Sequence, residues 1–140
     1  MKVVLDANVL VSAVFGGVPR RAFDRALREE LWISADTEAE LLELTDKLSR
    51  IMKSAELLEW KANLGSFLAS VHRGSAREQV VLSRDRDDDP YLALAKAIGA
   101  DFLVTGDKDL LSIRRDQLDR ASLGRLRIVT PRQFLDQTSG

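Results

Sequence analysis

The chain has 140 residues, of which 45% are hydrophobic, and its formal net charge is −1. This size suits one globular domain with a sizeable core, which we place over residues 1–140 with the last few disordered. The absence of cysteine excludes disulfides, thiol catalysis and zinc–thiolate sites, and it favours a reducing compartment. No apolar run approaches the ~20 residues of a membrane span, so we expect a cytoplasmic protein with no membrane partner.

Short apolar segments alternate with helical patterns along the chain. In chain order, the predicted strands are Lys2–Leu5, Leu31–Ser34, a less pronounced one at Gln79–Leu82, Asp101–Thr105 and Leu126–Thr130. Apolar stripes predict helices over Pro19–Glu30, Thr37–Lys53, Ala55–His72, Pro90–Ile98, Lys108–Ile113 and Pro131–Gln137. Asp6-Ala7-Asn8 is expected to form a turn between two hydrophobic segments. Apolar strands alternating with helices predict an α/β sandwich with a mostly parallel sheet.

Acidic residues follow every predicted strand but the last. Asp6 follows the first strand, "ADTEAE" the second, "RDRDDD" the weak segment at 79–82, and Asp107 and Asp109 the strand after it. In open α/β sheets, ligands bind beyond the carboxyl ends of the strands. We therefore expect these acids to gather at one edge of the sheet.

Crowded carboxylates repel one another, so such a cluster is costly unless a positive charge lies among them. Oxygen ligands suit Mg²⁺ or Mn²⁺, and one or two such ions in an acidic cleft can cleave a phosphodiester bond. Each acid also has a structural interpretation. Asp6, Asp88, Asp89 and Asp107 could merely cap helices, and Thr37-x-x-Glu40 matches a capping box. The single histidine, His72, is expected at the exposed end of a helix.

Four stretches of the chain resemble the motifs of the PIN-domain ribonucleases, most closely the toxin components of bacterial and archaeal toxin–antitoxin pairs. These stretches are "VVLDANVLVSA", "ISADTEAELLEL", "RDRDDDPYLALA" and "GADFLVTGDKDLL". The resemblance implies a three-layer α/β/α sandwich with strand order 3-2-1-4-5, bound Mg²⁺ or Mn²⁺, and RNA endonuclease activity. It also implies that the chain can form a homodimer and that an antitoxin protein can occupy its active-site groove.

Carried over residue by residue, the resemblance implies a catalytic, metal-binding set of Asp6, Glu40, Asp88 and Asp107. The residues that would support this set are Asn8, Thr105 and Asp109. Two placements stay open, because Glu38 or Glu43 could replace Glu40, and Asp87 could replace Asp88.

Arginine supplies 15 of the 21 basic residues, and its planar guanidinium suits phosphate. The predicted contacts to the RNA backbone are Arg20, Arg21, Arg114 and Arg115. Solvated helix and loop surface is the alternative for both arginine groups.

The leading hypothesis is a metal-dependent endoribonuclease that acts as the toxin of a toxin–antitoxin pair. The alternative is a non-catalytic RNA- or protein-binding module of the same fold. A phosphatase with Asp6 as nucleophile is disfavoured, because Asn8 stands where a second aspartate would serve as general acid.

Overall fold

A computed structural model describes residues 1–75, 80, 82 and 89–139 of the chain. Its strands are β1 (Lys2–Leu5), β2 (Glu30–Ile33), β3 (His72–Arg73), β4 (Phe102–Val104) and β5 (Arg127–Val129). Its helices are α1 (Ala7–Ala13), α2 (Gly17–Ala26), α3 (Ala35–Ile51), α4 (Ser54–Ser70), α5 (Asp89–Ile98), α6 (Lys108–Leu111), α7 (Arg115–Arg120) and α8 (Pro131–Thr138). None of the helices in these ranges is both long and apolar enough to cross a membrane.

The five strands form one parallel sheet in the order β3-β2-β1-β4-β5, which confirms the order that the sequence motifs imply. β1 lies at the centre, with Val3 opposite both Leu31 of β2 and Phe102 of β4. The chain leaves β1 in one direction toward β2 and later returns to β4 on the other side. The carboxyl ends of β1 and β4 are therefore neighbours at one edge of the sheet.

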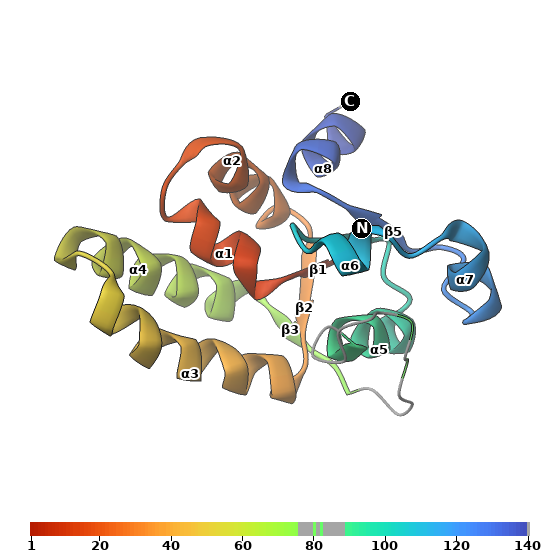
Figure 1. Ribbon diagram of the computed structural model, residues 1–140, viewed down its shortest axis with the longest axis horizontal. Coiled ribbons are helices and arrows are strands. Elements are labelled where there is room, and N and C mark those ends of the chain that lie inside the picture. The colour runs from red at the N-terminus through yellow and green to blue at the C-terminus, as the bar shows by residue number, and fades with distance from the viewer. Residues whose placement is uncertain (76–79, 81, 83–88, 140) are drawn as a thin grey trace.

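Both faces of the sheet are covered by helices, so the fold is a three-layer sandwich (Figure 1). In β1, Val3 and Leu5 belong to the core under α1–α4 and α8, whereas Val4 belongs to the core under α5, α6 and α7. Successive side chains of a strand point to opposite faces, so a central strand with two apolar faces must be apolar throughout. This explains the uninterrupted "VVL" of the first strand.

The structure corrects four expectations about secondary structure. The residues after Asp6 form α1 rather than a turn, and α7 was not predicted. The fifth strand is β3 at His72–Arg73; Val80 and Leu82 of the expected segment are not in a strand, and residues 79 and 81 lie outside the described part. The helix expected to end at His72 ends at Ser70. These errors have one cause, since elements of a few residues carry too little periodicity to be recognised.

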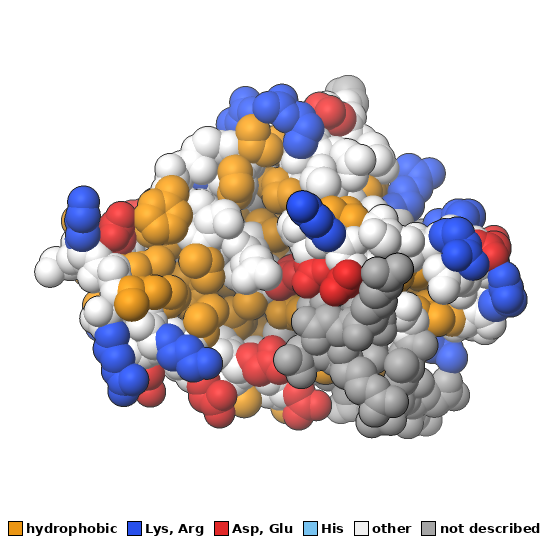
Figure 2. Space-filling view, viewed as in Figure 1, with side chains coloured by type: hydrophobic (Ala, Val, Ile, Leu, Met, Phe, Trp, Pro, Cys, Tyr) orange, Lys and Arg blue, Asp and Glu red, His pale blue; other side chains and the backbone are white. Residues whose placement is uncertain are grey.

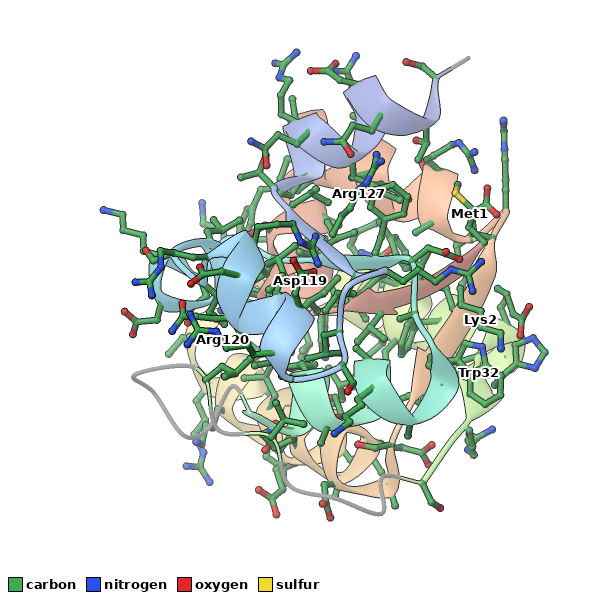
Figure 3. All side chains as sticks on the ribbon, turned by 90° about the vertical axis from the view of Figure 1, so that its right-hand side faces the viewer. Met1, Lys2, Trp32, Asp119, Arg120 and Arg127 are labelled. Carbon is green, nitrogen blue, oxygen red and sulfur yellow. The ribbon has the colours of Figure 1, made fainter. Side chains whose placement is uncertain are left out.

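His72 therefore lies on an edge strand, not on a helix. Its side chain is exposed, as expected, and stacks on Trp32 with 5.1 Å between the ring centroids. Trp32 of β2 and Lys2 of β1 also lie side by side (Figure 3), with the Lys2 ammonium 5.9 Å from the ring centroid. The Lys2 ammonium also donates a hydrogen bond to the Ile98 carbonyl, 3.1 Å away. His72 is thus part of a surface contact at the edge of the sheet.

Candidate metal centre

Asp6 ends β1 and begins α1, and it is almost fully buried, with 3% of its surface exposed. Its backbone N–H donates to the Val104 carbonyl at 3.0 Å, which extends the β1–β4 ladder to this residue. One carboxylate oxygen accepts the Asn8 N–H at 3.1 Å, and the other accepts the Thr105 hydroxyl at 2.7 Å. The capping role and a functional role are therefore compatible, because each carboxylate oxygen keeps a second lone pair.

Thr105 connects Asp6 to Asp107. It is fully buried at the end of β4, and its hydroxyl oxygen accepts the Asp107 N–H at 2.9 Å while its proton goes to Asp6. This chain of two hydrogen bonds fixes the relative position of the two acidic residues. Thr105 thus contacts both aspartates, and its supporting role at a metal stays a prediction.

Asp107 is the N-cap of α6. Its Oδ1 accepts the N–H groups of Asp109, at 2.7 Å, and Leu110, at 3.3 Å. Its Oδ2 has no hydrogen bond within the part of the chain that the structure describes. Capping thus orients Asp107 and leaves one oxygen for a ligand.

The pKa of Asp6 is raised above its ordinary value of 3.8. Burial is the largest cause, and the negative charge of Asp107 adds to it; hydrogen bonds from Thr105, Asn8 and Tyr91 act in the opposite direction. The environment therefore disfavours the charged carboxylate. A divalent cation would remove this penalty, so the donor set fits Mg²⁺ or Mn²⁺.

The second motif lies on α3, whose N-cap is Ser34. The Ser34 hydroxyl oxygen accepts the Thr37 N–H at 3.2 Å, so the capping box expected at Thr37 and Glu40 is wrong. Thr37 is itself buried in the first turn, and Glu40 falls in the second turn with an exposed side chain. The capping interpretation therefore no longer explains why a glutamate stands at position 40.

The two alternatives to Glu40 have different surroundings. Glu38 pairs with Arg73 of β3, with 2.8 Å between Nε and Oε1. Glu43 lies on the side of α3 away from the buried residues Leu41 and Leu48. Glu40 flanks the buried face on the side opposite to Glu38. Which of the three glutamates would bind a metal stays a prediction.

The third motif cannot be placed. Asp87 and Asp88 lie outside the described residues, so no contact is assigned to either. Within the described ranges, no group of three or more acidic or histidine side chains is close enough to hold a metal ion. Figure 2 shows acidic side chains near the middle of one face, next to the grey part of the chain. Asp6 and Asp107 are the two predicted ligands that the described structure brings together.

Asn8 contributes in a way that the sequence did not indicate. Its backbone N–H, not its side chain, bonds to Asp6, and its side chain is exposed. Asp109 likewise reaches Asp107 through its backbone N–H. A role for either side chain at the metal stays a prediction.

Three of the four arginines proposed for RNA contact have partners within the protein. Arg115 donates to the carbonyls of Leu123, Gly124 and Leu126, and Arg114 pairs with Asp116. Arg120 also pairs with Asp116, and Arg127 donates to Gln137 (Figure 3 shows α7 with Arg120, and β5 with Arg127). These contacts hold α7 and β5 in place, which is a structural role.

Of the two neighbouring arginines on α2, Arg20 has partners within the protein and Arg21 does not have an ion pair among the described residues. Arg20 joins α2 to α4 through Glu59 and the buried Asn63, whereas Arg21 is exposed and has no ion pair in the described part of the chain. We expect Arg20→Gln to lower the free energy of unfolding by about 1–3 kcal/mol, because the buried Asn63 oxygen loses its donor. Urea denaturation should detect this loss. Arg21→Gln, the control, should change stability by less than ~0.5 kcal/mol; an equal loss in both variants would contradict the structural role of Arg20.

The parallel sheet defines an α/β domain in which Asp6 and Asp107 lie together at the carboxyl ends of two central strands. A family model described as PIN domain matches residues 2–109, which include all four predicted acidic ligands, and the chain belongs to this family. An uncharacterized protein of Methanocaldococcus jannaschii is 26% identical over 147 residues, covering 98% of this chain and 91% of that protein. The PIN domain is a nuclease-type fold that is common in toxin–antitoxin systems.

Proposed function

We propose that the protein is an endoribonuclease that uses Mg²⁺ or Mn²⁺ to hydrolyse phosphodiester bonds in RNA. The observation that carries this proposal is the buried carboxylate of Asp6, which is linked through Thr105 to Asp107 and has a raised pKa. No cationic side chain of the described residues forms an ion pair with Asp6 or Asp107. A purely structural capping role would not require a carboxylate at so buried a position.

In this mechanism Asp6 and Asp107 would hold the cation, with Glu40 and Asp88 as the further proposed ligands. When bound, the cation would supply a Lewis acid and lower the pKa of an attacking water. Thr105 fixes the position of the two aspartates relative to each other, and the burial of Asp6 excludes bulk water from its carboxylate. Attack of water on phosphorus, with cleavage of the bond to the 3′ oxygen and proton transfer to that oxygen, gives a 5′-phosphate and a 3′-hydroxyl.

The proposal is tested by incubating the purified chain with a labelled single-stranded RNA in Mn²⁺, in Mg²⁺ and in excess EDTA. We expect cleavage with either metal and none with EDTA. The downstream fragments should carry a 5′-phosphate, which a 5′-phosphate-dependent exonuclease detects. Cleavage that persists in EDTA would overturn the metal mechanism. No cleavage of any RNA, together with no change of the melting temperature in Mn²⁺, would favour the non-catalytic binding module.

We further propose that the protein acts as the toxin of a toxin–antitoxin pair, because the family to which it belongs is common in such systems. Expression of the chain alone should then arrest growth, and the product of a short neighbouring reading frame should relieve the arrest. An Asp6→Asn variant that arrests growth equally well would contradict a toxin role based on RNA cleavage.

A further inference from the structure

We propose that Tyr91 is a positioning residue for Asp6, and that its hydroxyl fixes the backbone beside the carboxylate that would hold the cation. This inference rests on the proposed function, because it assigns Tyr91 a role in the same centre. Tyr91 is the third residue of α5 and is 96% buried, with 4% of its surface exposed. Sequence reasoning missed it, because an aromatic residue near the start of a buried helix is ordinarily a core residue.

The Tyr91 hydroxyl accepts a hydrogen bond from the Ala7 N–H at 3.1 Å. Ala7 is the first residue of α1, and amides in the first turn of a helix have no acceptor within that helix. Tyr91 supplies the missing acceptor from another element. The bond therefore fixes the backbone directly after Asp6, which is the N-cap of the same helix.

The Asp6 carboxylate itself accepts the Asn8 N–H of α1 and the Thr105 hydroxyl after β4. The Tyr91 hydroxyl of α5 holds the next residue, Ala7, by its backbone N–H. These three contacts, from three different elements, fix the place of Asp6 between β1, α1 and α5. Hydrogen bonding by Tyr91 also lowers the pKa of Asp6, in the same direction as that by Thr105.

The bond between Tyr91 and Ala7 joins two of the sequence motifs. α5 begins at Asp89, within the third motif, and Ala7 belongs to the first motif. The bond between Tyr91 and Ala7 joins these two segments, which are 84 residues apart in sequence. Tyr91 therefore sets the position of α5 relative to the carboxylate of Asp6.

The test is Tyr91→Phe, which removes the hydroxyl and keeps the buried ring. Isothermal titration with Mn²⁺, without RNA, should show affinity weakened by about 10-fold or more, as is typical when a residue that orients a metal ligand is lost. The control is Thr45→Val, which removes another hydrogen-bonded hydroxyl, one that contacts Leu41 and Trp60 between α3 and α4. Its Mn²⁺ affinity should stay within about 2-fold of the original, whatever its stability, because residues with no shared partners act independently.

A second measurement does not depend on metal binding. In the unsubstituted protein without metal, the Ala7 amide should exchange with deuterium as slowly as interior helix amides, and Tyr91→Phe should accelerate it. Tyr91 has no positioning role if Ala7 exchanges as fast as an exposed first-turn amide. The same conclusion follows if Tyr91→Phe binds Mn²⁺ normally, or if Thr45→Val weakens binding equally.

Failure of this inference can be told apart from failure of the proposed function. If the unsubstituted protein binds no Mn²⁺, the proposed metal centre and this inference both fail. Metal binding and cleavage unaffected by Tyr91→Phe would overturn only the inference.

Discussion

The substitution Asp6→Asn should reduce metal-dependent RNA cleavage by more than about 100-fold, the upper end of what the loss of a residue that supports a metal ligand costs. Asparagine is as good an N-cap as aspartate, so α1 should keep its first turn. The variant loses one negative charge and one carboxylate oxygen at the site. The comparison is made from cleavage rates at saturating RNA, with Mn²⁺ varied.

The matched control is Asp101→Asn at the opposite edge of the sheet. Asp101 directly precedes β4, accepts the Lys2 N–H at 2.9 Å and pairs with Arg125. This acid therefore holds the sheet together at the amino end of a strand, where α/β sheets do not bind ligands. We expect Asp101→Asn to lower stability while cleavage stays within about 2-fold of the original. Equal activities of the Asp6 and Asp101 variants would contradict the proposed centre.

Asp107→Asn separates the role of Asp107 as the N-cap of α6 from the role of its negative charge at the proposed centre. The Oδ1 contacts with Asp109 and Leu110 can be kept by the amide oxygen of asparagine, so α6 should persist. Loss of cleavage in a folded Asp107→Asn variant would then result from the loss of charge, not of the cap.

The second large effect concerns the stability of the protein without metal. The pKa of Asp6 is raised in the folded state, so the folded protein binds this proton more tightly than the unfolded chain does. The stability that Asp6 contributes is therefore fully present below its unfolded value, near 3.8, and is lost as pH rises through its folded value. Asp6→Asn has no such group and should not lose this stability.

We therefore expect the free energy of unfolding of Asp6→Asn, minus that of the unsubstituted protein, to increase as pH rises above about 4 and then to level off. Urea denaturation in EDTA between about pH 4 and 8 measures this difference. Saturating Mn²⁺ should reverse the sign of this difference at neutral pH, because a cation bound only by the folded state stabilises the charged carboxylate. A difference that decreases with rising pH would show that the folded protein favours the charged form of Asp6, contrary to its burial.

The buried carboxylate of Asp6 is a position where the requirements of a metal site and of a stable core oppose each other. Asp6 and Thr105 occupy the buried edge next to the apolar residues Val104 and Leu5, where an apolar side chain would cost less. In the proposed function this cost has a reason, because a metal ion would require oxygen ligands at that position. Asp6 is thus both the residue that the sequence places at the end of the first strand and the residue whose burial lowers the stability of the fold.

The sequence by itself determined the class of fold, because four of the five strands are uninterrupted apolar runs and the long helices have clear apolar stripes. Val3, Val4 and Leu5 already required a strand buried on both faces. The acids after such strands were therefore expected at one edge, where the structure links Asp6 to Asp107. Local patterns carry this information, because side-chain periodicity depends only on neighbours along the chain.

Only the tertiary structure decided how the acids are held. The sequence did not reveal that Thr105 joins Asp6 to Asp107, that Ser34 rather than Thr37 caps α3, or that Tyr91 reaches Ala7 from α5. Nor could it separate Arg20, which joins two helices, from the exposed Arg21 beside it. The physical reason is that hydrogen bonds between residues distant in sequence depend on where whole elements pack, and no local pattern records that position.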